Sequence, residues 1–184
     1  AAAVTSTGQK MIKYASEVAC LREGCKQYYG DTDSMYVSCR VSLFKDIDRR
    51  YYGGGMSKLS YYVGLVKITM VEAARVNAAV NEAVSVYVES GYLRMEFEEV
   101  LWPAGFLRRK VYFGTAHTAL DYEKGTIRFD PEIEDVFMRG LSIVKRDTVP
   151  MQCKLTGELV VETLRVNNPT DIRGLVIKKT KEAY

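Results

Sequence analysis

Residues 28–37 constrain this chain more than any other part of its sequence. Two tyrosines lead into Gly30, Asp31 and Asp33 follow with one residue between them, and an apolar run then resumes. Aromatic and β-branched residues favour strands, whereas glycine and aspartate favour turns. The stretch therefore predicts two strands joined by a tight turn that carries two carboxylates.

Two carboxylates on a rigid turn are candidate metal ligands. Mg²⁺ typically takes one or two protein carboxylates and leaves its other positions to water and substrate phosphates. An EF-hand loop is excluded, because Met35 and Tyr36 stand where it needs an oxygen ligand and a glycine. A phosphatase-type pair, which ends an apolar parallel strand, is excluded by the hairpin pattern. Phosphoryl transfer is the favoured reaction class, and a plain solvated turn stays open as the alternative.

The composition is that of an ordinary folded protein. Of the 184 residues, 47% are hydrophobic and 27% are charged, a profile that excludes a disordered chain. The length allows one good core or two small ones, and we expect two. The net charge of +3 is too small to prove a nucleic-acid partner. No run of residues could span a bilayer and no signal peptide opens the chain, so we expect an intracellular protein with no membrane partner.

The cysteines and the histidine carry little chemistry. The cysteines at 20, 25, 39 and 153 form no C-x-x-C pair, so a zinc site is not expected. Reduced and mostly buried thiols are the expectation. His117, the only histidine, has no carboxylate or cysteine at a telling spacing, and we expect it to be packed or on the surface rather than catalytic.

The spacing of apolar residues predicts an α+β fold, in which an antiparallel sheet carries the acids and long helices cover one face. The chain opens within a helical pattern and has no initiating Met, so we expect a piece of a longer protein. Helices are expected at 2–21, at 60–90 with Gly91 as the stop, and after Pro150; strands at 26–29, up to 41, and at 92–101, 106–118 and 136–144; irregular chain at 42–57; and turns at 103–105 and 124–125.

The predicted hairpin resembles a known motif, and further matches follow in the same order. Residues 29–34 read Y-G-D-T-D-S and resemble the third palm motif of family B DNA polymerases. The other matches cover nearly the whole chain: 1–8 resemble the helix after the family's nucleotide-binding motif, 95–100 and 106–114 its acidic strand and K-K-x-Y primer-gripping segment, and 139–140 with 144–147 its K-G and R-R-D positions.

This resemblance implies a catalytic metal site on the turn. Asp33 would be the main catalytic carboxylate, Asp31 its weaker partner in metal binding, and Thr32 a nucleotide contact. Glu98 matches the family's third palm acid and is expected near the metals. Two Mg²⁺ ions, or Mn²⁺ in their place, would act there. The alternative stays open that Glu98, like Glu96 two residues earlier, is an ordinary charged residue on the exposed face of a strand.

The resemblance also implies a primer-template surface. Lys110 and Tyr112 match the K-x-Y pair that contacts the primer terminus, with Arg109 as a neighbouring phosphate contact. Lys145 and Arg146 extend this surface toward the thumb. Cations beside a tyrosine neutralise backbone phosphates without reading sequence. A solvated strand edge is the alternative for these cations.

The chain departs from the family pattern in several places. Val111 stands where a basic residue is frequent, so one phosphate contact would be missing. Arg139 stands where lysine is frequent and Lys145 where arginine is frequent, and these two exchanges change bidentate geometry more than charge. The D-x-x-S-L-Y-P-S segment with the other catalytic aspartate, the K-x-x-x-N-S-x-Y-G helix and the exonuclease acids are not in these residues. The chain alone is therefore not expected to be active.

The resemblance as a whole implies a DNA-directed DNA polymerase in the nucleus or cytoplasm of a cell or an infected host. Residues 1–148 would be the C-terminal part of the palm and 149–184 the start of a helical thumb. The implied partners are primer-template DNA, deoxynucleoside triphosphates and the remainder of the polymerase, with its N-terminal, exonuclease and fingers parts and first palm motif. A non-catalytic DNA-binding or assembly module, derived from a split or degenerate polymerase, is the alternative.

Overall fold

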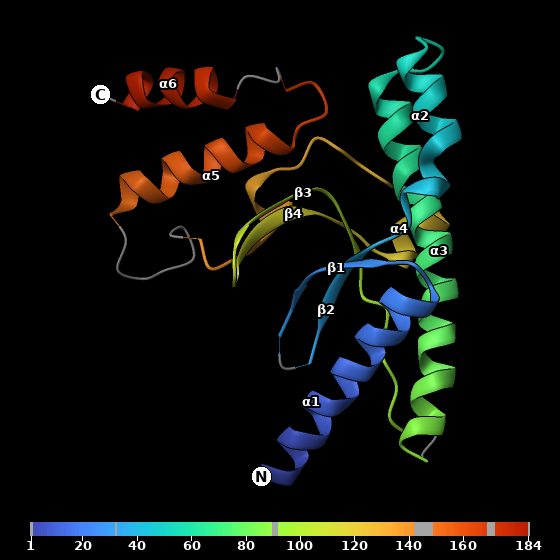
Figure 1. Ribbon diagram of the computed structural model, residues 1–184. Coiled ribbons are helices and arrows are strands. Elements are labelled where there is room, and N and C mark those ends of the chain that lie inside the picture. Colours follow the sequence, from blue (N-terminus) through green and yellow to red (C-terminus); the bar gives the residue numbers. More distant parts are fainter. Residues whose placement is uncertain (1, 32, 90–91, 142–148, 169–171, 184) are drawn as a thin grey trace.

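The longest helix, α3 (Lys58–Tyr87), runs along one side of the molecule in the computed structural model (Figure 1), which describes residues 2–31, 33–89, 92–141, 149–168 and 172–183. The Ser57 side chain caps it by accepting a hydrogen bond from the Ser60 amide at 3.1 Å. The long helix expected at 60–90 is confirmed as far as Tyr87. The predicted stop at Gly91 lies outside the described residues.

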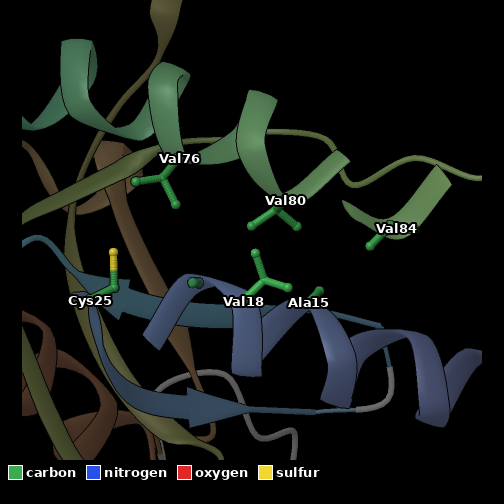
Figure 2. Close-up of a cluster of buried hydrophobic side chains, with 7 residues drawn as sticks. Ala15, Val18, Cys25, Val76, Val80 and Val84 are labelled. Carbon is green, nitrogen blue, oxygen red and sulfur yellow. The ribbon is translucent and has the colours of Figure 1, made fainter. Parts of the chain in front are cut away.

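Helix α1 (Ala2–Glu17) continues into a π-helical turn, Val18–Arg22, and packs against α3. Figure 2 shows Ala15 and Val18 facing valines of α3 in a buried cluster that also holds Cys25. Ala15 is fully buried, so its small side chain allows the two helices to approach closely. The helix predicted at 2–21 is confirmed.

The two aspartates lie on a hairpin of β1 (Lys26–Gly30) and β2 (Met35–Ser38), which pair antiparallel. The pairing puts Gly30 opposite Met35 and shifts register between Gln27 and Tyr29. Both strands and the turn between them were predicted, although β2 ends at Ser38 rather than near position 41. Among the described residues this hairpin forms a two-stranded sheet of its own.

A second antiparallel sheet has the order β3-β4-β5, with β3 at Val100–Arg108, β4 at Val111–His117 and β5 at Val136–Arg139. Helices cover this sheet and the hairpin (Figure 1). The α+β fold class with an antiparallel sheet backed by helices is therefore confirmed. The strand predicted at 136–144 is present as far as Arg139, and its last residues lie outside the described part of the chain.

The turn predicted at 103–105 is wrong, because these residues lie inside β3 and the chain reverses at Arg109–Lys110 instead. Strand β3 is an edge strand, and the register shifts between Leu101 and Ala104. Proline is tolerated at such a place, since its missing N–H costs no ladder hydrogen bond there. Gly105 serves close packing rather than a turn, because a Cβ at this position would lie 2.8 Å from the Phe113 ring.

The strand predicted at 92–101 is wrong for 92–99, which pair with no strand among the described residues. A side chain takes the place of a neighbouring strand at one point. The Asn81 amide donates to the Met95 carbonyl at 2.8 Å and accepts from the Met95 N–H at 2.7 Å. This pair of hydrogen bonds fastens the extended segment to α3.

The irregular chain predicted at 42–57 is also wrong in part. A 3-10 turn at Val41–Phe44 leads into helix α2 (Lys45–Tyr52), which packs beside the start of α3. Two aspartates in the first turn of α2 and two arginines in its last turn complement the helix dipole. This charge pattern is visible in the sequence, but the helix was not predicted because it is short and has few apolar residues.

Helices dominate the rest of the chain. Helix α4 (Ala119–Lys124) has a capping box between Thr118 and Asp121 and ends at the left-handed Gly125, where a turn was predicted. Helix α5 (Pro150–Leu164) packs on the β3-β4-β5 sheet, and α6 (Ile172–Ala183) lies beside α5 (Figure 1). The helices predicted after Pro150 are confirmed. Within the described ranges no helix is long and apolar enough to cross a membrane.

A charged network ties the base of the hairpin to α3. Glu72, 7% exposed, accepts hydrogen bonds from Arg75 at 2.8 and 2.9 Å and lies 3.6 Å from the Arg40 guanidinium. Arg75 also pairs with Glu23 at 2.6 Å. The Arg75 hydrogen bonds hold the pKa of Glu72 below its usual range, against the opposing effect of burial. The network joins α3 to the segments on both sides of the β1–β2 hairpin.

We expect Glu72→Gln to lower the free energy of unfolding by about 1–2 kcal/mol at neutral pH, because two charge-assisted hydrogen bonds weaken. The folded pKa of Glu72 is lowered, so the ionised carboxylate stabilises the fold above its unfolded pKa near 4.5, and this contribution disappears as pH falls through the folded value. Urea unfolding at neutral pH and at about pH 3 measures both effects.

The exposed Asp46–Arg49 pair provides the control, and Asp46→Asn should cost less than about 0.5 kcal/mol. The difference in free energy of unfolding between wild type and Glu72→Gln should disappear on acidification. An equal difference at both pH values would contradict the assignment.

Candidate active site at the β1–β2 hairpin

The turn of the hairpin is closed by its own backbone. The Asp31 N–H donates to the Ser34 carbonyl at 2.9 Å, directly beyond the Gly30–Met35 pair. Asp33 is exposed at this turn, whereas Asp31 is partly buried. Thr32, the predicted nucleotide contact, lies outside the described residues. The structure thus presents both predicted catalytic carboxylates on one short turn, Asp33 outward and Asp31 toward the protein.

Asp31 contacts both Tyr29 and Lys110. Its Oδ2 accepts a hydrogen bond from the Tyr29 hydroxyl at 3.0 Å and lies 3.2 Å from the Lys110 ammonium. Burial, and then the hydrogen bond to Asp31, raise the pKa of Tyr29 above its usual value, so the phenol stays protonated and keeps donating. The Asp31–Lys110 ion pair joins two segments that lie far apart in the sequence.

Lys110 reaches Asp31 from the β3–β4 turn. Arg108 pairs with Val111 across this turn, and Lys110 adopts a left-handed φ of 61°, which is uncommon for a residue with a Cβ. Gly140 packs against the Lys110 carbonyl so closely that a Cβ at position 140 would overlap it. The Arg139-Gly140 segment, predicted from its resemblance to the family's K-G positions, therefore fixes the turn that carries Lys110.

Aromatic rings fill the space between the hairpin and the second sheet. The Tyr112 ring lies 5.3 Å from the Tyr29 ring, 5.2 Å from the Tyr36 ring and 5.3 Å from the Phe106 ring, centroid to centroid. Tyr112 is only 6% exposed. Burial and the hydroxyl of Tyr112 raise the pKa of Tyr36. In this structure Tyr112, a predicted primer contact, is a packing residue beneath the turn.

The acidic segment before β3 lies beside the aromatic cluster. Glu98 is exposed, whereas Glu99 is partly buried and its Oε1 has no hydrogen-bond partner among the described residues. Burial, then the neighbouring Glu98, raise the pKa of Glu99, and Arg139 opposes them. Sequence reasoning missed Glu99. Phe97, two residues earlier, is partly buried as well.

The predicted metal ligands are gathered only in part. Among the residues that the structure describes, no three histidine, cysteine, aspartate or glutamate side chains are placed to hold one ion. Asp31 and Asp33 share a turn, but the structure does not bring Glu98 together with them as a third ligand. The donor chemistry of the turn still fits a hard divalent cation, because Asp31 and Asp33 both offer carboxylate oxygens.

A groove of about 630 Å³ runs beside the turn, between residues 27–30 and 106–109. Arg108 and Arg109 line it, as do Tyr28, which is 57% exposed, and Phe106. The Lys26 ammonium lies 5.0 Å from the centre of the Tyr28 ring. Sequence reasoning placed Arg109 near this site but missed Tyr28, whose exposure depends on the register shift in β1.

The remaining predicted residues fall into two groups. Lys145 and Arg146 lie outside the described part of the chain. His117 is 2% exposed, and its Nε2 lies 2.7 Å from the Trp102 carbonyl, which accepts a hydrogen bond from the ring. Burial lowers the pKa of His117, so the ring is neutral. It is a packed histidine. Of the thiols expected to be mostly buried, Cys25 is buried and those at 20, 39 and 153 are partly buried, and no disulfide joins them.

Comparison with known proteins relates the chain to DNA polymerases. It is 30% identical, over 98% of its length, to proteins named DNA polymerase beta from African swine fever virus isolates Tick/Malawi/Lil 20-1/1983 and Pig/Kenya/KEN-50/1950. It is 28% identical, over 89% of its length, to a DNA polymerase of Paramecium bursaria Chlorella virus NY2A. The chain spans only 14–15% of the length of these relatives. No family model matches it.

The aromatic cluster provides a test of how the two sheets are joined. We expect Tyr112→Ala to lower the free energy of unfolding by about 3 kcal/mol, because a buried ring is lost, and Tyr112→Phe to cost only about 1 kcal/mol, because only the hydroxyl is lost. Denaturant unfolding measures both. Tyr122→Ala, at an exposed position on α4, should cost less than about 0.5 kcal/mol. Equal costs at positions 112 and 122 would contradict this packing.

Proposed function

We propose that the chain is part of a family B DNA polymerase, with residues 1–148 in the palm and 149–184 at the start of the thumb, and that it takes part in template-directed DNA synthesis. The observation that carries this proposal is the ion pair between Asp31 and Lys110. It puts the turn with two carboxylates beside the turn with the cations, as a phosphoryl-transfer site on a polyanion requires. The similarity to viral DNA polymerases over 98% of the chain supports it.

Asp33 and Asp31 are the residues that would hold Mg²⁺, or Mn²⁺, in this site. When bound, two such ions supply charge stabilisation for the attacking and leaving oxygens of an in-line displacement. Asp33 is exposed and points its carboxylate outward, which suits the main ligand. Asp31 is engaged by Tyr29 and Lys110, which suits a weaker ligand. Thr32 lies between the two acids and would contact the incoming nucleotide.

The cations beside the turn would bind primer-template DNA. The Lys110 side chain is 64% exposed and pairs with Asp31, so a DNA phosphate could replace Asp31 as its partner. Arg109 lines the adjacent groove, and Lys145 and Arg146 would add phosphate contacts nearer the thumb. The buried Tyr112 would position the Lys110 turn against the hairpin.

The reaction we propose is attack of the primer 3′-hydroxyl on the α-phosphate of a deoxynucleoside triphosphate, with release of pyrophosphate. The other catalytic aspartate, the nucleotide-binding helix and the exonuclease would come from the remainder of the polymerase, together with its N-terminal part and fingers. The chain alone would therefore not be active. The whole protein would work in the nucleus or cytoplasm of a cell or an infected host.

A second candidate is a non-catalytic DNA-binding or assembly module from a split or degenerate polymerase. The observation that favours it is that Asp31 already has a cation partner, while no three ligand side chains are gathered for a metal among the described residues. In that case the cations would bind DNA and the carboxylates would only shape the turn.

The test is Asp33→Asn in the longer polymerase. We expect primer extension to fall by about a hundredfold or more, because a carboxylate that stabilises transition-state charge is lost. Asp31→Asn should cost less. Binding of primer-template should stay within about twofold in both variants, since phosphate contacts carry most of that affinity.

The matched control is Asp130→Asn, which changes an exposed aspartate away from the turn and should leave extension unchanged. Full extension by Asp33→Asn would contradict the catalytic role. A wild-type protein that binds primer-template but never extends it would favour the non-catalytic module.

A further inference from the structure

We propose that the α2–α3 tip, residues 45–62, is a second nucleic-acid contact that binds a single strand by stacking a base on Tyr52 and contacting phosphates through Arg49 and Arg50. The tip is at the end of the molecule away from the turn of the β1–β2 hairpin (Figure 1). It therefore differs from the site proposed for catalysis. The proposal does not depend on metal binding at Asp31 and Asp33.

A pair of stacked tyrosine rings supports the tip. The Tyr51 ring stacks on the Tyr61 ring with centroids 4.2 Å apart and planes 5° apart. The Tyr61 hydroxyl donates to Asp48 Oδ1 at 2.7 Å, which ties α3 to α2. Burial, followed by this hydrogen bond, raises the pKa of Tyr61, so its hydroxyl keeps the proton that it donates.

Tyr52 lies next to this stacked pair, and its ring is exposed to solvent. It meets Tyr51 edge-on, with centroids 5.3 Å apart and planes 63° apart, and it is 79% exposed. At this exposure most of the Tyr52 ring is open to solvent. A free aromatic face on a fixed support is what a base needs for stacking, and every base has such a face itself.

The charge around Tyr52 is positive. Residues 45–58 contain four cations and two aspartates. Asp48 is engaged by Tyr61, and Asp46 faces Arg49 at 3.2 Å in a pair whose side chains are 89% and 78% exposed, so solvent weakens it. Arg50 is exposed and makes no ion pair within the described ranges. The last turn of α2 therefore offers two exposed arginines, Arg49 and Arg50, to a phosphodiester backbone.

The neighbouring glycine loop excludes a different kind of phosphate site. The N–H groups of Gly53, Gly54 and Gly55 donate to the carbonyls of Arg49, Tyr51 and Arg50 at 2.9–3.0 Å. These N–H groups already have acceptors within the protein and cannot bind a nucleotide phosphate. A nucleic acid would therefore be bound here through side chains. An exposed ring with neighbouring arginines fits unstacked bases, which a single strand offers and a duplex does not.

The test uses a fluorescent single-stranded oligothymidine and anisotropy at several salt concentrations. Tyr52→Ala should weaken binding about fivefold or more, while Tyr52→Phe should restore it because the ring is kept. Arg50→Ala should lower the slope of log affinity against log salt by about 0.7. Blunt duplex DNA should bind all variants within about twofold.

Tyr122→Ala is the matched control, since it removes another exposed tyrosine on a different helix. Circular dichroism checks that each variant is folded. Oligothymidine affinity and salt slope unchanged by both Tyr52→Ala and Arg50→Ala would overturn the proposal. A loss with Arg50→Ala alone, matched by an equal loss of polyglutamate binding, would overturn it in favour of an acidic protein partner. Because the catalytic proposal is read out by primer extension, either proposal can fail without the other.

Discussion

Tyrosine packing, rather than strand pairing, holds the β1–β2 hairpin against the β3-β4-β5 sheet. The two sheets share no ladder among the described residues, and the Tyr112 ring fills the space between them. Directly above it, Asp31 and Lys110 form an ion pair. If the rings did not fix the distance between the sheets, the acidic and basic turns would not form one site. At the other end of the hairpin, the buried Glu72 network fixes the strands to α3.

The local parts of this arrangement were predictable from the sequence. The Y-G-D-T-D-S run predicted a hairpin with both acids on its turn, and apolar periodicity predicted α1, α3 and α5. In each case neighbouring residues decide the structure. The resemblance to family B polymerases assigned the hairpin to the metals and residues 106–114 to the primer, and it did not predict the Asp31–Lys110 pair.

Predictions failed where distant residues decide the structure. The turn expected at 103–105 is strand, because β3 is an edge strand and Gly105 packs on the Phe113 ring. The strand expected at 92–99 is absent, because Asn81 takes up the Met95 backbone groups. Tyr112 is buried among other rings, a packing role that its sequence did not reveal, and its contact with a primer stays a prediction. No spacing rule reveals such partners, since each comes from another part of the chain.

We propose that the turn carrying Asp31 and Asp33 attracts a divalent cation beside the basic Lys110 turn. The most direct measurement is a titration of the chain with a small fraction of Mn²⁺, followed through the backbone amide signals in NMR spectra. We expect the amide signals of Gly30, Ser34 and Lys110 to broaden first and excess Mg²⁺ to restore them. Sharp signals at the turn, with broadening instead at the acidic segment 132–135, would contradict it.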